Sequence, residues 1–254
     1  MLAISLEART ALVSGGSRGI GRATALMLAR AGAAVGIGYS SDAKAAGEVV
    51  DTIARQGGRA VALGADLSRW SAAEQMLKQC VEQLGPPDIL VVSHGIWKRA
   101  PIDRISEAEW DEMADVNLKA AIALCRFATE RMKLIQRGSI ILISSTAGQR
   151  GEAEHSHYAA SKGALISLTK SLCPELAPFN IRVNCVAPGW VETDMVRATL
   201  ADDVERRKIE RAIPLGRVGR AEEIAGAVLF LASDLSTFVN GEVLNVNGGA
   251  VLVG

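Results

Sequence analysis

Apolar runs rich in β-branched residues alternate with amphipathic segments along the whole chain. Within each run the hydrophobicity is nearly continuous, which indicates strands that are buried on both faces of a parallel sheet. This alternation predicts an α/β fold of the Rossmann type, a doubly wound sheet of about seven parallel strands with helices on both faces. The runs lie at residues 10–15, 33–39, 59–67, 88–95, 138–146, 181–189 and 242–249.

The chain has no low-complexity linker, and its 254 residues suit one large α/β domain, so we expect a single domain over residues 1–254. The longest irregular stretch is an insertion at about 189–216, which is rich in charge and closes with Pro214 and Gly216. In a doubly wound fold such an insertion lies over the carboxyl ends of the strands, where ligands bind. It is therefore a candidate substrate loop; a solvated helical insertion is the alternative.

Composition and charge exclude several classes of function. Lys plus Arg and Asp plus Glu each number 28, so the formal net charge is zero and the basic surface of a nucleic-acid-binding protein is missing. No apolar run approaches the roughly 20 residues that cross a bilayer, and the first ten residues lack the layout of a secretory signal. Four scattered cysteines without a CxxC pair predict reduced thiols in a cytoplasmic protein, with no metal site.

A glycine-rich turn, SGGSRGIG (14–21), joins the first predicted strand to the first predicted helix. Gly15, Gly19 and Gly21 are spaced G-x-x-x-G-x-G. Glycines at this point permit a tight turn and let backbone N–H groups approach a pyrophosphate at the helix N-terminus. Many such turns use glycine for geometry alone, but the position at the start of a βαβ unit predicts dinucleotide binding.

The end of the second predicted strand distinguishes NADP from NAD. NAD selectivity usually needs an acidic residue there, bonded to the ribose hydroxyls, but this strand ends with Tyr39 and Ser40. Asp42 follows at the helix start and is read as an N-cap. Arg18, inside the glycine turn, is placed to pair with a 2′-phosphate, so NADP(H) is predicted and NAD(H) is the alternative. Asp66, after the third strand, is a candidate for the adenine amino group or for a helix cap.

The stretch HYAASKGAL (157–165) places Tyr158 and Lys162 four residues apart, on one face of a helix. A tyrosine in water has a pKa near 10, and a close cation lowers that pKa by stabilising the phenolate. We therefore expect Lys162 to make the Tyr158 hydroxyl more acidic. Ser144 or Ser145 emerges where the strand at 138–146 ends, facing the same crevice, and a serine there orients a substrate carbonyl while the phenol supplies a proton.

With the glycine turn, these residues resemble those of a known family, the single-domain short-chain dehydrogenases/reductases, over essentially the whole chain. The resemblance implies that Ser145, Tyr158 and Lys162 are catalytic and that Asn117, in DVNLKA, completes a water-linked proton relay. PGWVET (188–193) is similar to the family's PGxxxT segment, which borders the nicotinamide and binds its carboxamide. The cofactor-binding residues expected from the turn, the strand ends and the resemblance are Gly15, Ser17, Arg18, Gly19, Ile20, Gly21, Tyr39, Ser40, Asp66, Leu67, Gly95, Tyr158, Lys162, Pro188, Gly189, Val191 and Thr193.

The chain departs from the family pattern at two places. The threonine that usually opens the glycine motif is Ser14, which keeps a hydroxyl, and the family's NNAG after the fourth strand is here VSHG (92–95). Losing both asparagines weakens the network that they form between the central strands. His94 is read as a packed, hydrogen-bonded neutral histidine, or as a pH-sensitive polar substitute. His155 and His157 stand beside Tyr158, either to touch the substrate or to cap the loop.

The resemblance implies hydride transfer between C4 of a nicotinamide and a carbonyl carbon, in an NAD(P)-dependent oxidoreductase of CH–OH and C=O groups. GGSRGIG and GYSSD are similar to 3-oxoacyl-[acyl-carrier-protein] reductases, so a 3-oxoacyl thioester is the expected substrate. A sugar or polyol dehydrogenase is the alternative. A non-catalytic cofactor-binding sensor or scaffold is an alternative of another class, against which the intact Ser, Tyr, Lys and Asn argue.

The same resemblance implies partners. Acyl carrier protein is acidic and docks through basic residues near the active-site mouth; Arg126, Arg131, Lys133 and Arg137 are the candidates, although a solvated helix face explains them equally well. The family is commonly tetrameric, so a homotetramer is expected. Segments 110–132 and 158–177 are the candidate interface helices, since their apolar residues wrap around more than one face.

Overall fold

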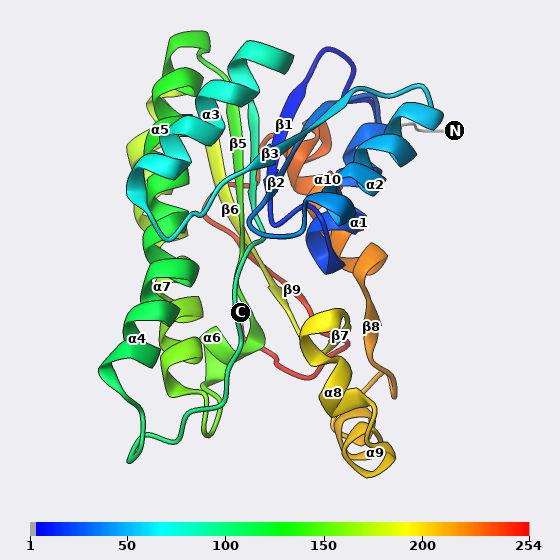
Figure 1. Ribbon diagram of the computed structural model, residues 1–254, viewed down its shortest axis with the longest axis vertical. Helices are drawn as coiled ribbons and strands as arrows, with labels where there is room; N and C mark the ends of the chain where they lie inside the picture. Colours follow the sequence, from blue (N-terminus) through cyan, green and yellow to red (C-terminus); the bar gives the residue numbers. More distant parts are fainter. Residues whose placement is uncertain (1–3, 254) are drawn as a thin grey trace.

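Seven parallel strands form the central sheet of the protein, in a computed structural model that describes residues 4–253 (Figure 1). Their spatial order is β3-β2-β1-β4-β5-β6-β9, and all seven fall within the runs predicted from the sequence. The predicted doubly wound α/β fold is therefore confirmed. The strands are β1 (Thr10–Ser14), β2 (Ala34–Tyr39), β3 (Ala60–Gly64), β4 (Ile89–Val92), β5 (Gly138–Ile143), β6 (Ile181–Pro188) and β9 (Val243–Val246).

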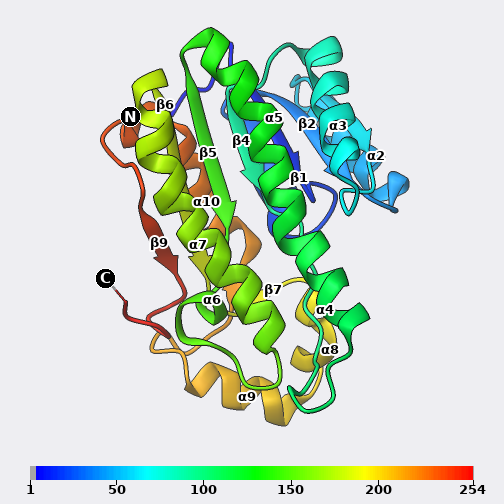
Figure 2. The same ribbon diagram turned by 90° about the vertical axis from the view of Figure 1, so that its left-hand side faces the viewer.

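Helices cover both faces of this sheet. One layer holds α1 (Gly19–Arg30), α2 (Ala43–Arg55) and α10 (Ala221–Ala232), and the other holds α3 (Trp70–Leu84), α5 (Ala120–Ile135) and α7 (Ser156–Leu176) (Figures 1 and 2). Successive strand residues face opposite layers: Ala11 and Val13 pack with the first layer, and Leu12 packs with the second. This two-sided burial explains why the strands read as unbroken apolar runs.

Shorter helices complete the chain, and most of them stand at the carboxyl edge of the sheet. A π-helical segment, Asp115–Lys119, joins α4 to α5, which breaks the single helix expected over 110–132. No described helix is long and apolar enough to cross a membrane. The remaining helices are α4 (Glu107–Ala114), α6 (Thr146–Arg150), α8 (Arg197–Leu200), α9 (Asp203–Arg211) and the 3-10 turns Ala177–Phe179, Asp194–Val196 and Asp234–Ser236.

The insertion after β6 is more regular than its sequence indicates. A two-stranded parallel sheet, β7 (Val191–Glu192) with β8 (Gly219–Arg220), brackets α8 and α9. This unit has a small core of its own, formed by Leu200, Ile209, Ile213 and Val218. It extends from the carboxyl edge of the sheet, at the lower right in Figure 1. The insertion is thus helical and extends from the carboxyl edge of the sheet. Its role as a substrate loop remains a prediction.

The topology puts a crevice at the carboxyl end of β1. From β1 the chain first builds β2 and β3 on one side, then crosses back to β4 on the other. In doubly wound sheets ligands bind where the strand order reverses in this way. The carboxyl ends of the strands, together with α7, therefore position the groups described below.

Candidate active site

The glycine turn after β1 has a backbone that only glycine fits. Gly15 and Gly19 adopt positive φ angles, +67° and +51°. A Cβ at Gly21 would lie 2.1 Å from the carbonyl oxygen of Gly15, so any side chain there would open the turn. Arg18, the N-cap of α1, makes no side-chain capping bond, so the first N–H groups of α1 remain available at the cleft.

A cleft of about 600 Å³ runs from this turn across the carboxyl ends of the strands. It is lined by the glycine turn, by Tyr39 and Ser40, by Asp66 and Leu67, and by Gly95. Its shape and donors fit a dinucleotide, because the uncapped N-terminus of α1 borders the cleft and can receive a pyrophosphate. The structure thus brings together the residues predicted for the adenosine and pyrophosphate half of the cofactor.

The carboxylates near the adenosine end are engaged in turns. Asp42 caps α2 by accepting the N–H of Ala45 at 2.9 Å, as its N-cap interpretation required. Asp66 accepts the hydroxyl and the N–H of Ser68, at 2.7 and 3.2 Å, and these bonds lower its pKa. Arg18 is exposed at the rim of the cleft. The cleft therefore offers a ribose 2′ position the guanidinium of Arg18 from the turn after β1, while the end of β2 carries Tyr39 and Ser40 instead of an acidic residue.

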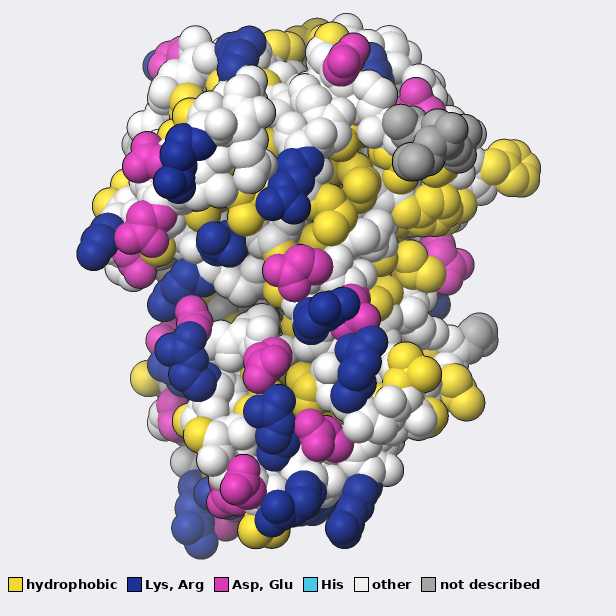
Figure 3. Space-filling view, turned by 90° about the vertical axis from the view of Figure 1, so that its right-hand side faces the viewer, with side chains coloured by type: hydrophobic (Ala, Val, Ile, Leu, Met, Phe, Trp, Pro, Cys, Tyr) yellow, Lys and Arg dark blue, Asp and Glu magenta, His cyan; other side chains and the backbone are white. Residues whose placement is uncertain are grey.

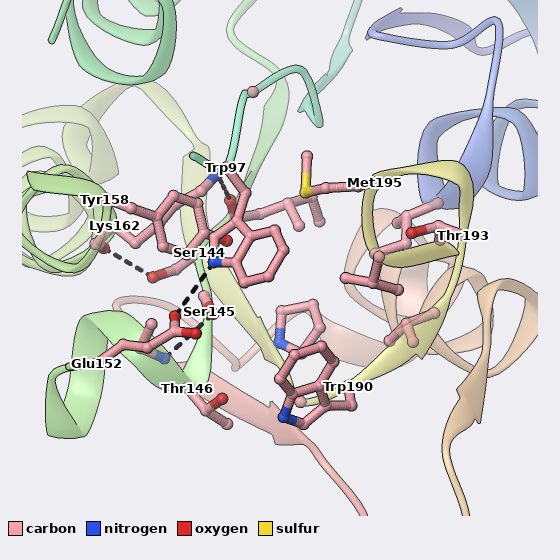
Figure 4. A pocket seen from close by; sticks show the side chains of 18 of the residues that line it. Trp97, Ser144, Ser145, Thr146, Glu152, Tyr158, Lys162, Trp190, Thr193 and Met195 are labelled. Atoms are coloured by element: carbon pink, nitrogen blue, oxygen red, sulfur yellow. Dashed lines mark hydrogen bonds between the residues drawn. The ribbon is translucent and has the colours of Figure 1, made fainter. Parts of the chain in front are cut away.

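The cleft continues into a cavity of about 130 Å³ that holds the expected catalytic side chains (Figure 4). Ser145, Tyr158 and Lys162 all line it, and so do Pro188 and Gly189. Val191 and Thr193, the remaining residues predicted for the nicotinamide, lie on the same wall. Sequence positions spread over some 50 residues thus meet at one point because β5 and β6 end side by side.

Two serines follow β5, and the structure separates their roles. Ser144 is buried and donates its hydroxyl to the carbonyl of Lys162 at 2.7 Å, which ties β5 to α7. Ser145 is partly exposed to the cavity, and its Oγ caps α6 by accepting the N–H of Ala147 at 3.1 Å. Ser145 also lowers the pKa of the Tyr158 phenol, which lines the same cavity. Ser145 is therefore the serine placed to meet a substrate oxygen.

Lys162 is buried one helical turn beyond Tyr158. Its Nζ donates to the carbonyl of Ile143 at 2.9 Å and lies 5.9 Å from the centre of the Tyr158 ring. Burial lowers the pKa of Lys162 to about 8. Gly95 leaves room for Asn117 beside Lys162, since a Cβ at Gly95 would lie 3.1 Å from Oδ1 of Asn117 and in ordinary contact with Nζ of Lys162.

The expected acidification of Tyr158 is wrong for this structure. Burial raises the pKa of Tyr158 to about 12; the hydrogen bond from Ser145 opposes this shift, and the charge of Glu152 adds to it. Lys162 points its ammonium at the Ile143 carbonyl, so it does not offset the desolvation of the phenol. Tyr158 consequently holds its proton at neutral pH, as a proton donor must.

Asn117 lies in the π-helical segment, and three hydrogen bonds hold its side chain. Oδ1 accepts the N–H of Ile96 at 2.8 Å, while Nδ2 donates to the Ile96 carbonyl at 3.0 Å and to the Ser161 hydroxyl at 3.1 Å. These bonds clamp the loop after β4 onto the helix that carries Tyr158. Single π-turns are frequent at functional sites, and the proton-relay role of Asn117 remains a prediction.

Neither histidine beside Tyr158 lines the cavity. His155 stacks behind Trp97, and His157 is buried next to the charge of Glu109, with its pKa lowered by burial. His94 does line the cavity, and its imidazole is bonded to Ser14, which agrees with the packed, neutral interpretation.

Sequence reasoning missed several cavity residues. Trp97, Trp190, Glu152, Thr146 and Met195 all face the cavity from three different segments (Figure 4). Trp190 occupies a variable position inside PGWVET, and Trp97 follows the strand-end glycine by two residues. A search for aromatic residues just beyond the strand ends would have found both tryptophans.

The basic residues proposed to surround the active-site mouth lie elsewhere. Arg131, Lys133 and Arg137 stand at the end of α5 and immediately before β5, which is the amino edge of the sheet. Arg137 pairs there with Asp88, at 3.2 Å, just ahead of β4. Because the strands are parallel, the amino edge is opposite the catalytic cavity, so within one copy of the chain this patch does not flank its own site. Arg126, further up α5, is paired with Glu130.

Comparison with known proteins agrees with this geometry. The family model described as enoyl-(acyl carrier protein) reductase matches residues 15–251. A 3-oxoacyl-[acyl-carrier-protein] reductase FabG of Staphylococcus epidermidis is 39% identical over 241 residues, which are 95% of this chain and 98% of that protein. The crystal structure of a dehydrogenase/reductase from Sinorhizobium meliloti is 42% identical with a TM-score of 0.91, covering 98% of each chain. That of a gluconate 5-dehydrogenase from Burkholderia cenocepacia, in complex with NADP and tartrate, is 34% identical with a TM-score of 0.93, covering 98% of this chain and 97% of the other.

A dinucleotide cleft that leads to a Ser–Tyr–Lys cavity defines an NAD(P)-dependent oxidoreductase of CH–OH and C=O groups. The glycine spacing, the tyrosine–lysine pair and the full-length matches go further, and the chain belongs to the short-chain dehydrogenase/reductase family. The family resemblance read from the sequence is thereby confirmed.

Proposed function

We propose that the protein is an NADP(H)-dependent reductase of 3-oxoacyl thioesters. The observation that carries this proposal is the cavity at the inner end of the cofactor cleft, which Tyr158 and Ser145 line together. Burial raises the pKa of Tyr158, so the phenol is protonated at neutral pH and has a proton to give to the alkoxide that develops during reduction. Full-length similarity to 3-oxoacyl-[acyl-carrier-protein] reductases supports the substrate class.

The chemistry divides between cofactor and protein. When bound, NADPH supplies the hydride that reaches the carbonyl carbon, and C=O becomes CH–OH. Ser145 holds the carbonyl oxygen, Tyr158 gives it a proton, and Lys162 binds the nicotinamide ribose. Asn117 holds the water that returns a proton to Tyr158.

The preference for NADP(H) rests on Arg18 and on the missing carboxylate after β2. Asp42 is committed to its helix cap, whereas the Arg18 guanidinium is exposed beside Ser40 in the same cleft. A guanidinium recognises a phosphate through paired N–H donors. Related structures crystallised with NADP support this choice.

The proposed partners are an acyl carrier protein and three further copies of the chain. In a single copy, α5 and α7 lie side by side on an open face (Figure 2), and Leu252 and Val253 are exposed at the chain end. A two-fold axis across α5 and α7 would bring the basic end of α5 toward the carboxyl edge of the second copy, where its cavity opens. The docking patch would then serve the neighbouring subunit. We place this assembly in the cytoplasm, in keeping with its four free cysteines.

The second candidate function is a sugar or polyol dehydrogenase, which the solved gluconate dehydrogenases and the tryptophans of the cavity favour. Two assays separate the functions: NADPH or NADH oxidation with acetoacetyl-CoA, and NADP⁺ reduction with a panel of aldonates, sugars and polyols. Thioester-dependent oxidation, faster with NADPH, is expected. Turnover confined to the sugar panel would refute the proposal, and tight cofactor binding without any turnover would indicate a sensor.

A further inference from the structure

Trp97 stands where the cofactor cleft meets the catalytic cavity, and it lines both. It lies in the loop after β4, and the clamp of Asn117 on Ile96 fixes that loop one residue earlier. In Figure 4 the indole of Trp97 is drawn between Tyr158 and Trp190, across the space that a substrate must enter.

Three contacts hold the indole. Its ring stacks on His155, with centroids 4.5 Å apart and an interplanar angle of 1°, and it meets Trp190 edge-on at 5.9 Å and 83°. Its Nε1–H donates to Oε2 of Glu152 at 3.4 Å (Figure 4). Aromatic pairs in such contact stabilise each other beyond the area that they bury. These contacts hold the Trp97 indole in one position at the edge of the cavity.

The support behind Trp97 is itself fixed. His155 is buried, does not line the cavity, and bonds through Nδ1 to the carbonyl of Ala153 at 3.0 Å. Its ring therefore presents a constant face to the indole. Since His155 covers one face of Trp97, the substrate meets the remaining surface of the indole.

The small size of the cavity means that the Trp97 indole limits the size of the substrate. An apolar cavity of about 150 Å³ holds one benzene molecule, and the cavity beside Trp97 measures about 130 Å³. The nicotinamide, which is expected against Pro188 and Gly189, takes part of this volume. An acyl chain whose carbonyl lies at Ser145 and Tyr158 therefore soon reaches Trp97 or Trp190.

We propose that Trp97 determines substrate size and that the enzyme acts on short 3-oxoacyl thioesters, with His155 as the residue that positions the indole. This inference rests on the proposed function, because it specifies the acyl group of the same substrate. In Trp97→Ala a methyl group replaces the indole, which enlarges the cavity on the side of the loop after β4 and admits longer acyl chains.

The test is a series of 3-oxoacyl-CoA substrates from four to ten carbons, assayed with wild type, Trp97→Ala, Trp97→Phe and His155→Ala. Each surplus methylene that a rigid apolar wall rejects changes kcat/KM by about tenfold or more. We expect wild type to prefer the four-carbon substrate, and Trp97→Ala to raise the ratio of kcat/KM for the ten-carbon over the four-carbon substrate at least about tenfold. Trp97→Phe and His155→Ala should shift that ratio less, and His155→Phe, which keeps a stacking ring, should restore the wild-type ratio.

Controls distinguish a failure of this inference from a failure of the proposed function. Trp70→Ala removes an exposed tryptophan outside the cavity and should leave the ratio unchanged, and the KM for NADPH reports whether each variant keeps its cofactor cleft. If Trp97→Ala lowers kcat/KM equally at all chain lengths, Trp97 has only a structural role. That result, or an unchanged ratio of kcat/KM for the ten-carbon over the four-carbon substrate, would overturn the inference about Trp97 and leave the proposed function standing. Wild-type inactivity on every thioester overturns the proposed function and the inference together.

Discussion

The Nδ1 atom of His94 lies 2.7 Å from the Oγ atom of Ser14, and this contact joins the ends of the adjacent strands β1 and β4. The Ser14 Oγ also accepts the N–H of Ser93 at 3.2 Å. The family's two asparagines correspond to Val92 and Ser93 in this chain. The strand ends are joined instead by Ser14 and by His94, which stands at the family's alanine position. The bond lies directly beneath the glycine turn, since a Cβ on Gly15 would come within 2.8 Å of the His94 backbone.

His94 should make the protein acid-sensitive. Burial, reinforced by the charge of Lys162, lowers its pKa to about 4 in the folded protein, against about 6.5 for an unperturbed histidine. The unfolded chain therefore binds a proton first as the pH falls, and stability present above pH 6.5 is lost progressively down to about pH 4. Denaturant unfolding of wild type and His94→Asn over this window checks it. The wild-type curve should fall more steeply, and parallel curves would show that His94 is not the titrating group.

The Ser14–His94 bond should appear as an energetic coupling. A double-mutant cycle of Ser14→Ala and His94→Phe should give an interaction free energy of about 1 kcal/mol, the usual size for a hydrogen bond between neutral groups. Unfolding in denaturant at neutral pH measures it. A pair on the same strands without a mutual bond, Leu12 and Val91 to Ala, provides the reference for simple packing effects. Additive losses at Ser14 and His94 would contradict the coupling.

The parts of this protein that follow from short sequence spacings could be predicted. The glycine turn, the helical Tyr158–Lys162 pair and the strand-end Ser145 each depend on positions a few residues apart, and the unbroken apolar runs reveal strands buried on both faces. The stack of Trp97 on His155 could not be read in this way. Those residues are far apart in the chain, and their parallel rings result from how the β4 loop packs against the start of α7.

The predicted lowering of the Tyr158 pKa was wrong for a different reason. The i, i+4 spacing gives proximity to Lys162, but it does not say how deeply both groups are buried or where the ammonium points. Both are almost fully shielded from water, and desolvation outweighs the attraction that the spacing implies. The position of the basic patch relative to its own active site could not be predicted from the sequence, because it depends on the helix that leads into β5 ending at the amino edge of the sheet.

Removing the phenolic hydroxyl should abolish turnover while the cofactor still binds. Tyr158→Phe keeps the ring in its buried place and loses only the proton that the carbonyl oxygen takes up, so we expect kcat to fall about a thousandfold. NADPH binding, followed by fluorescence, should change little. Ser156→Ala, an exposed neighbour on α7, serves as the matched control. Full activity in Tyr158→Phe would assign the proton donor to another group.

Arg18 should carry the preference for NADPH over NADH. Loss of a charge-assisted hydrogen bond costs about 1.5–3 kcal/mol, so Arg18→Gln should raise the KM for NADPH about tenfold or more and leave the KM for NADH nearly constant. Arg22→Gln is the matched control, because Arg22 lies one turn further along α1 and outside the cleft. Steady-state kinetics with both cofactors decides the matter. An equal rise for both cofactors would place Arg18 on the shared pyrophosphate and remove its role in selectivity.

Lys162 should set the alkaline limit of the reduction. Its pKa is lowered to about 8, so the ammonium that binds the nicotinamide ribose is present below that pH and is lost above it. The rate should therefore be constant below pH 8 and then decline about tenfold per pH unit in kcat/KM for NADPH, as expected when one required proton dissociates. Tyr158 does not produce this limb, because its own pKa of about 12 keeps it protonated throughout. In Lys162→Arg the side chain stays positively charged at every accessible pH. The activity that this variant retains should therefore not decline above pH 8. A decline that remains near pH 8 would assign the titration to another residue.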